Sequence, residues 1–171
     1  RLSNLFAGTN SLGELLPMTN RDVNMVVTIR DGKGGLQSDL VKLQVFDTGD
    51  TFSVTSHTNS QSLGREETTE VRWNVAGTNT SPISCANVDI GLITVDGKEV
   101  DLLTTDNDGI ASITIPSNAS PLSDARFKVS CSSSKFFNIS SGNITILDQV
   151  GGGSVDTTCS GGGGSLNGFM L

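Results

Sequence analysis

The chain has 171 residues, a formal net charge of −7 at pH 7 and a pI near 4.5. This acidic balance, with no basic stripe, excludes a nucleic-acid backbone as the main partner. Hydrophobic residues make up 35% of the sequence, and no apolar run is long enough to span a bilayer, so we expect no membrane span.

Strand-like stretches dominate the first fifty residues. The segments 2–7, 23–30 and 39–46 are rich in apolar and β-branched side chains. The second and third alternate apolar with polar positions, at Val23, Met25, Val27 and Ile29 and at Val41, Leu43 and Val45. The sequence DGKGG at 31–35 can take positive φ, which predicts a β-hairpin.

These first strands are too few to be stable by themselves. Three strands cannot close a sandwich, and a small isolated sheet buries too little apolar surface. We therefore expect residues 1–48 to be a partial β domain or a strand-exchanged segment. In the first case the missing strands precede Arg1 in a longer chain, of which this would be a fragment or processed product. In the second case another molecule supplies them.

Residues 51–148 predict a complete sandwich, because strand candidates follow one another at the spacing typical of such domains. The candidates are 52–56, 69–76, 88–95, 99–104, 110–115, 126–131, 136–139 and 143–147. Val71, Trp73 and Val75 alternate with polar residues, which predicts a core position for Trp73. Residues 122–125 are expected to form a helical turn. The predicted fold class is all-β, an immunoglobulin-like β-sandwich preceded by an incomplete β-sheet segment.

The three cysteines do not form a zinc-site pattern, because no CxxC pair occurs and the only histidine is remote. Cys85 and Cys131 each lie at the end of a predicted strand. We expect a disulfide between them and hence an oxidising compartment, with two buried thiols as the alternative. Cys159 is then either free or joined to another chain.

No catalytic constellation is apparent. His57 is the only candidate base for a Ser-His-Asp triad, but its neighbours Ser56 and Thr58 are ordinary strand-end residues. We expect His57 to be a surface residue. HExxH, GxSxG and phosphate-loop patterns are absent from the sequence, so the prediction is that the chain is not an enzyme.

An acidic turn is the candidate metal site. Asp106, Asn107 and Asp108 offer three oxygen-bearing side chains in one turn, and Ca²⁺ prefers such ligands. The alternative is a β-turn in which these side chains satisfy their own backbone. Asp47 and Asp50, in the linker before the sandwich, form a weaker calcium candidate.

Several separated motifs resemble a non-catalytic region of secreted bacterial zinc metalloproteases of the reprolysin-like kind. The motifs are VRWNVAGTN at 71–79, PISCANVDI at 82–90, NDG at 107–109, ARFKV at 125–129 and FFNIS at 136–140, preceded by RLSN at 1–4, ELLP at 14–17 and RD with GG at 30–35. The likeness covers about residues 1–148. The HExxH helix of such proteases is absent, so the resemblance carries over no catalytic residue. It implies that residues 1–50 end a domain that begins upstream.

The segment 149–171 is glycine-rich and is expected to be a flexible tail. Gly163, Gly164 and Ser165 resemble the start of a C-terminal sorting signal that a rhomboid-type protease processes in Gram-negative bacteria. An ordinary linker is the alternative. The resemblances imply a secreted or cell-surface protein of a Gram-negative bacterium.

Two functions remain open at this point. The first is a non-catalytic, extracellular, immunoglobulin-like binding or accessory module, whose partner is a protein or glycan at the cell envelope. The second is a structural subunit of an extracellular filament or surface layer, self-associating through strand donation or strand exchange. Calcium is the only cofactor that the sequence suggests for either.

Overall fold

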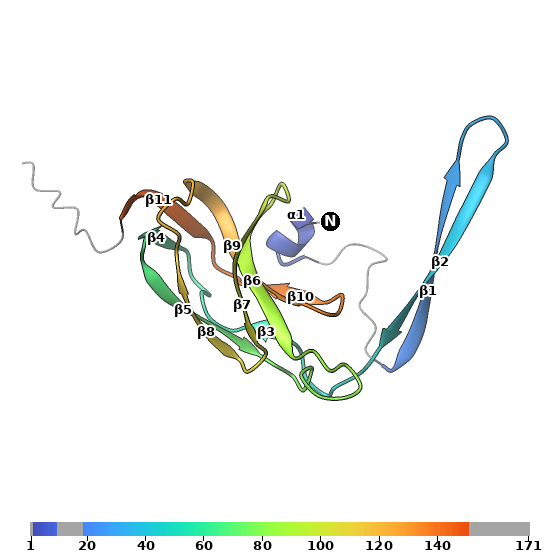
Figure 1. Cartoon of the computed structure of the whole chain (residues 1–171), viewed down its shortest axis with the longest axis horizontal. Helices are drawn as coiled ribbons and strands as arrows, with labels where there is room; N and C mark the ends of the chain where they lie inside the picture. Colours follow the sequence, from blue (N-terminus) through green and yellow to red (C-terminus); the bar gives the residue numbers. More distant parts are fainter. Residues whose placement is uncertain (1, 10–18, 151–171) are drawn as a thin grey trace, which may run out of the picture.

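A computed structural model describes residues 2–9 and 19–150 of the chain, and these residues are almost entirely β (Figure 1). The elements in chain order are α1 (Leu2–Phe6), β1 (Arg21–Arg30), β2 (Leu36–Val45), β3 (Ser53–Val54), β4 (Gln61–Arg65), β5 (Thr68–Asn74), β6 (Asn87–Thr94), β7 (Glu99–Asp106), β8 (Ile110–Thr114), β9 (Leu122–Cys131), β10 (Phe137–Ile139) and β11 (Ile144–Val150). The described part of the chain contains no helix that could cross a bilayer.

Strands β3 to β11 form two sheets. One has the order β4-β11-β9-β6-β7, with β10 also paired to β9, and the other has the order β3-β5-β8. Neighbouring strands are antiparallel except β4 and β11, which run parallel. This distribution of strands between two packed sheets is that of an immunoglobulin-like sandwich. The predicted all-β sandwich fold is confirmed.

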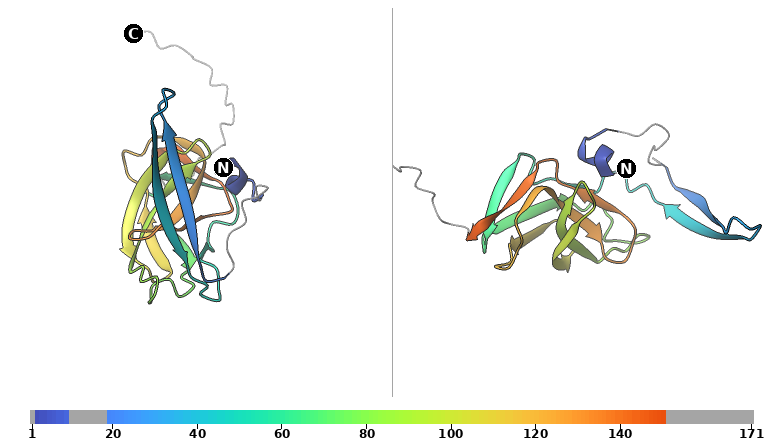
Figure 2. Two further views of the ribbon diagram at one scale, coloured as in Figure 1. Left: turned by 90° about the vertical axis from the view of Figure 1, so that its right-hand side faces the viewer. Right: turned by 90° about the horizontal axis from the view of Figure 1, so that it is seen from above.

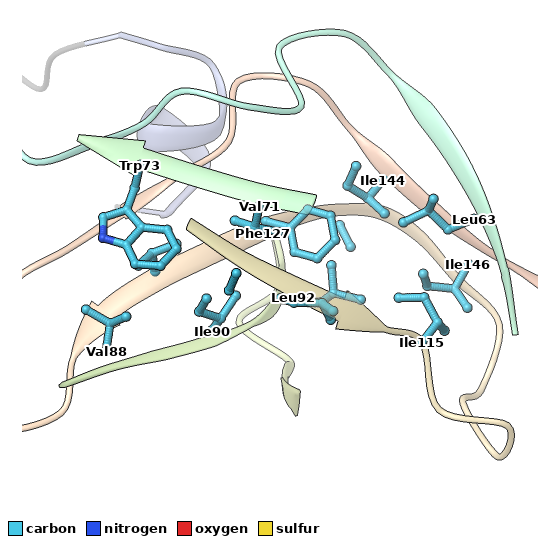
Figure 3. Close-up of a cluster of buried hydrophobic side chains, with 14 of the residues drawn as sticks. Leu63, Val71, Trp73, Val88, Ile90, Leu92, Ile115, Phe127, Ile144 and Ile146 are labelled. Carbon is cyan, nitrogen blue, oxygen red and sulfur yellow. The ribbon is translucent and has the colours of Figure 1, made fainter. Parts of the chain in front are cut away.

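The core lies between the two sheets (Figure 3). The period-two alternation of each strand sends its apolar side chains inward. Trp73 of β5 is 4% exposed and Phe127 of β9 is fully buried, as the alternation around Trp73 predicts. Around them pack Leu63, Val71, Val88, Ile90, Leu92, Ile113, Ile115, Val129, Ile144 and Ile146.

The predicted hairpin is confirmed, and it extends away from the sandwich (Figure 2). Strands β1 and β2 pair without a bulge from Arg21 opposite Val45 to Arg30 opposite Leu36. In the turn, Gly32 and Gly34 take φ values of 72° and 97°, which side-chain-bearing residues rarely adopt. The Asp31 carboxylate closes the turn by accepting the N–H groups of Lys33 and Gly35 at 2.7 and 2.9 Å.

The N-terminal stretch 2–7 is helical in α1, so the expected strand there is wrong. Leu2, Leu5 and Phe6 are spaced i, i+3, i+4, which is the periodicity of a helix face rather than of a strand. The expected helical turn at 122–125 is also wrong. Strand β9 begins at Leu122, because this segment pairs with β11.

Strand β4 is absent from the sequence-based prediction. The segment QSLGR contains one apolar side chain, Leu63, and no β-branched residue. It becomes a strand by pairing in parallel with β11, which places Leu63 at 0% exposure in the core. A long-range contact of this kind leaves no local pattern in the sequence.

Candidate functional site

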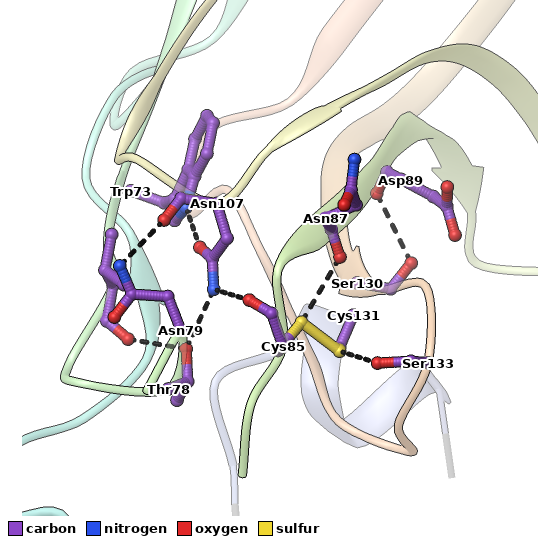
Figure 4. Close-up of a disulfide and its surroundings, with 11 residues drawn as sticks. Trp73, Thr78, Asn79, Cys85, Asn87, Asp89, Asn107, Ser130, Cys131 and Ser133 are labelled. Carbon is purple, nitrogen blue, oxygen red and sulfur yellow. Dashed lines mark hydrogen bonds between the residues drawn. A yellow bond between two sulfur atoms is a disulfide. The ribbon is translucent and has the colours of Figure 1, made fainter. Parts of the chain in front are cut away.

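The acidic turn after β7 is built around a buried asparagine (Figure 4). Asn107 is 3% exposed. Its Oδ1 accepts the indole N–H of Trp73 at 2.9 Å, and its Nδ2 donates to Thr78 Oγ1 and to the Cys85 carbonyl oxygen, both at 3.0 Å. The whole side-chain amide is therefore used inside the protein.

This arrangement bears on the calcium prediction. Asn107 points into the core, and Asp108 accepts the N–H of Ile110 at 3.2 Å, as in an Asx-turn. Asn107 is thus buried and its oxygen is engaged by Trp73, whereas Asp106 and Asp108 are exposed. Across residues 2–9 and 19–150, no group of three or more His, Cys, Asp or Glu side chains is placed to hold a metal ion. The geometry favours the alternative interpretation, a structural turn.

The two aspartates of the linker before the sandwich also have protein partners. Asp47 accepts the N–H of Gly49, and Asp50 accepts Asn74 Nδ2 at 2.8 Å. The hydrogen bonds from Asn74 and from the N–H of Thr51 lower the pKa of Asp50 below 3.8. Asp50 therefore ties the linker to β5 of the sandwich.

The predicted disulfide is present. Cys85 and Cys131 are bonded with their Cα atoms 6.0 Å apart, and both are buried. The bond joins the segment before β6 to the end of β9 (Figure 4). Cys85 also presents its carbonyl oxygen to Asn107, so the disulfide and the buried amide support one another. Cys159 and the predicted sorting residues Gly163, Gly164 and Ser165 lie outside the described residues.

His57 is partly buried, so the expectation that it lies on the surface is wrong. Its ring nitrogens are 2.9 Å from Ser56 Oγ and 3.0 Å from Thr69 Oγ1, and its ring centroid is 4.5 Å from that of Phe127. Both nitrogens thus contact hydroxyl groups rather than a carboxylate. The residue takes φ of 52°, a conformation that asparagine also tolerates.

The environment of His57 gives a pH prediction. Burial lowers the pKa of His57 below 6.5, because the protonated ring loses hydration. The unfolded chain then binds more protons between this lowered pKa and 6.5, so stability falls as the pH decreases through that window. We expect this loss in the wild type and a flatter profile in His57→Asn.

Urea unfolding followed by Trp73 fluorescence at pH values from about 7.5 to 5 measures this difference. Asp50 and Asp96 have pKa values below 3.8 and titrate at lower pH, outside the window. Parallel profiles for the wild type and His57→Asn would contradict the prediction.

The described N-terminal helix is fastened to the sandwich through Arg126 of β9. The guanidinium donates from Nη2 to the Phe6 carbonyl oxygen at 2.8 Å and from Nη1 to the Ser140 carbonyl oxygen at 3.1 Å. Its Cζ lies 4.9 Å from the Phe6 ring centroid, a cation–π contact. The chain is thus held on the sandwich before the hairpin by Arg126 and after it by Asp50.

The hairpin between these two anchors is the most exposed apolar feature among the described residues. No residue from Arg21 to Arg30 or from Leu36 to Val45 is buried. The side chains with the largest exposed fractions are Ile29 at 67%, Val26 at 64%, Leu40 at 61%, Leu36 at 57% and Val27 at 54%. We call the two strands with their side chains the hairpin surface. Exposed apolar patches are common binding surfaces of folded proteins, so the hairpin surface is the candidate functional site.

The register separates the two faces of the hairpin surface. Residues opposite each other point to the same face, so one face carries Val23, Met25, Val27, Ile29, Val41, Leu43 and Val45. On the other face Val26 and Leu40 lie between polar residues, and Lys42 Nζ is 2.9 Å from Asp22 Oδ2. The alternation predicted from the sequence is therefore present in the hairpin, but no side chain on either face is buried.

Two hollows lie elsewhere on the described surface. One, of about 290 Å³, is at the base of the hairpin between Phe46 and Pro82. The other, of about 330 Å³, opens at the end of the sandwich between Val100 and Leu122. Neither is lined by a histidine or a cysteine, so neither contains a nucleophile–histidine pair.

Comparison with known proteins assigns the chain to no family. No protein-family model and no curated protein sequence matches the chain. Among solved structures, it resembles SGBP-B of the Bacteroides ovatus mixed-linkage glucan utilization locus, in complex with a mixed-linkage heptasaccharide, at 12% identity and a TM-score of 0.33. The match covers 76% of this chain and 31% of that one, so the chain spans about a third of its length. This likeness is too distant to support a function.

Proposed function

We propose that this chain is a non-catalytic accessory module of an extracellular protein, in which the sandwich is a scaffold and the hairpin surface binds another polypeptide. The observation that carries the proposal is the pair of strands β1 and β2, which have no buried residue, carry exposed apolar side chains and pair with no third strand among residues 2–9 and 19–150. An isolated two-stranded hairpin is only marginally stable in water, so additional strands or a packed face would stabilise it.

The rest of the molecule supports this division of roles. The sandwich has its own buried core and its own disulfide, and it does not need the hairpin to complete a sheet. The Cys85–Cys131 bond also supports an oxidising location such as the cell exterior or the periplasm. The side chains of His57, Asp50 and Asn107 each make internal hydrogen bonds within the sandwich and its linker.

A polypeptide partner fits the hairpin surface better than a glycan. The single tryptophan is buried at 4% exposure, and the sequence contains no tyrosine. The exposed apolar residues of the hairpin are aliphatic, and they lie beside strand edges that pair with no other strand in the described part of the chain. Backbone pairing to such an edge is a common way in which proteins bind extended peptides.

Filament formation is the second candidate function. The hairpin leaves two outer edges, one on β1 and one on β2, and an edge-to-edge contact between unlike edges would repeat without closing. This candidate differs from the first in requiring that both edges be occupied at once.

Site-specific photo-crosslinking tests the proposed function. A photoreactive residue at Met25 or Leu40, both exposed on the hairpin, should form polypeptide adducts when the full chain is mixed with the extracellular fraction of the producing cells. The matched control is Ser112, which is exposed on β8 of the sandwich. Adducts mapped to the hairpin positions and not to Ser112 are expected. Equal yields at all three positions would contradict the proposal.

A further inference from the structure

Strand β1 has a sequence that complements itself when it is turned end to end. Residues 21–31 read RDVNMVVTIRD. With Val26 as the centre, an antiparallel copy places Asp22 opposite Arg30 and Arg21 opposite Asp31. Inside these charged ends, Val23 faces Ile29, Asn24 faces Thr28 and Met25 faces Val27. Opposite charges meet at both ends, polar residues meet polar residues, and apolar residues meet apolar residues.

The backbone of the hairpin permits this pairing. The Asp31 N–H donates to the Gly35 carbonyl oxygen at 3.3 Å, in the same register as the strands, so residues 31 and 35 are a hydrogen-bonded pair. Such pairs alternate with non-hydrogen-bonded pairs along an antiparallel ladder. Val26 and Leu40, five positions along, are therefore a non-hydrogen-bonded pair. Their N–H and C=O groups point to the two outer edges of the hairpin.

The outer edge of β1 lacks the features that usually prevent pairing. It runs for 10 residues without a bulge, contains no proline or lysine, and has no charge between Val23 and Ile29. The edge of β2 differs, because Lys42 and Asp39 lie in its middle. When two β2 edges pair in antiparallel fashion with their corresponding faces on the same side, residues of the same parity lie opposite each other. Lys42 is at an even position and Asp39 at an odd one, so this pairing cannot place the two charges opposite each other.

We propose that two copies of this chain form a symmetric dimer by antiparallel pairing of their β1 edges about Val26. The sheet then has the order β2-β1-β1-β2 across the two copies. Four strands with one apolar face meet the requirement for a stable sheet that the two-stranded hairpin fails. The contact is isologous, so it closes at two copies and leaves β2 free. The inference rests on the proposed role of the hairpin surface and names its partner.

The charged ends fix the register. Asp22 already pairs with Lys42 of its own hairpin, and in the dimer it also lies opposite Arg30 of the other copy. If the two strands slide by two residues, the backbone hydrogen-bonding pattern is kept, but Asp22 no longer lies opposite Arg30 of the other copy. Pairing of β1 with the β2 edge of a second copy is less complementary. The register that places Asp22 opposite Lys42 also places the apolar Val26 opposite the polar Ser38. The closed dimer therefore matches at more positions than the open fibre.

A matched pair of proline variants tests the edge. Val26→Pro removes the central edge-facing N–H of β1, and Leu40→Pro removes the N–H directly across the hairpin on the β2 edge. The two side chains are 64% and 61% exposed, so both substitutions disturb the hairpin alike. Sedimentation equilibrium of the full chain should show a dimer for the wild type and for Leu40→Pro. Val26→Pro should raise the dissociation constant about a hundredfold. Equal effects of the two prolines would overturn the inference.

Charge reversal tests the register without proline. Arg30→Asp places like charges opposite Asp22, and Asp22→Arg places like charges opposite Arg30, so each variant alone should dimerise about tenfold more weakly. In a mixture of the two variants every opposed pair is again complementary. The mixture should form a heterodimer with an affinity near that of the wild type. Failure of mixing to restore association would contradict the proposed register.

The outcomes separate this inference from the proposed function. A wild-type chain that stays monomeric overturns the dimer, while hairpin-specific crosslinks to other extracellular polypeptides would still support the binding role. A polymer whose mass grows with concentration would also overturn the dimer, in favour of pairing between unlike edges. In the closed dimer, amide hydrogen exchange should slow at Asn24 and Val26 but not at Leu40 or Lys42.

Discussion

Replacing Asn107 with alanine should lower the free energy of unfolding by about 4 kcal/mol. The substitution leaves the indole N–H of Trp73 and the carbonyl oxygen of Cys85 buried without partners. Each unsatisfied group costs about 1 to 3 kcal/mol, and the lost amide also leaves a small cavity. Thr78 is less affected, because its hydroxyl also donates to the Val75 carbonyl oxygen at 2.7 Å.

Urea unfolding monitored by fluorescence measures this loss directly, because Trp73 is the only tryptophan. Asn118→Ala is the matched control, since Asn118 is exposed. The same experiment separates the two interpretations of the acidic turn. If Asn107 acts through the core, its substitution is equally costly in EDTA and in Ca²⁺. A cost that appears only with Ca²⁺ would instead support the calcium site.

A conservative variant refines the test. Asn107→Asp keeps an acceptor for Trp73 but faces the Cys85 carbonyl oxygen with a second acceptor and buries a charge. Burial should raise the pKa of the new carboxyl, so the variant should gain stability relative to the wild type as the pH falls through that raised value. A pH-independent difference would show that packing, rather than the hydrogen bonds, is responsible for the effect.

Removing the disulfide is expected to have an effect of similar size. Cys85 and Cys131 are 46 residues apart, and a loop of this length corresponds to about 4 kcal/mol of stabilisation through the unfolded chain. Cys85→Ala with Cys131→Ala should lower the urea midpoint accordingly. The comparison should be made in a Cys159→Ala background, so that the third cysteine of the sequence cannot exchange with the pair.

Reduction of the otherwise unchanged Cys159→Ala chain provides the control for packing. It breaks the covalent link but keeps both sulfur atoms, whereas the alanine pair also removes buried volume. Both treatments should therefore destabilise the sandwich, and the alanine pair more so. A reduced chain as stable as the oxidised chain would contradict the assigned role of the disulfide.

The parts of the fold that sequence reasoning predicted are those with a local pattern. The hairpin follows from the alternation at Val23, Met25, Val27 and Ile29 together with the glycines of its turn. The core position of Trp73 follows from the alternation with Val71. The disulfide pair follows from the placement of two cysteines at strand ends.

The parts that were missed depend on contacts between distant residues. Strand β4 is defined by its parallel pairing with β11, and α1 packs through Arg126, 120 residues away. Asn107 has the sequence context of a turn, and only the position of Trp73 shows that its amide faces inward. The local sequence predicts the hairpin itself. Its exposure depends on where the rest of the described chain packs, and the sequence of the hairpin does not encode this.

The parallel pair β4 and β11 has a mechanical consequence if the chain is pulled from both sides of the sandwich. Tension between the start of β4 and the end of β11 would load their hydrogen bonds together in shear, rather than one at a time. If the sandwich then opened, the Cys85–Cys131 bond would withhold its 46-residue loop from extension. At about 3.3 Å per extended residue, this shortens the reach of the unfolded chain by roughly 150 Å. A tether built from this module would therefore yield only a limited length under force.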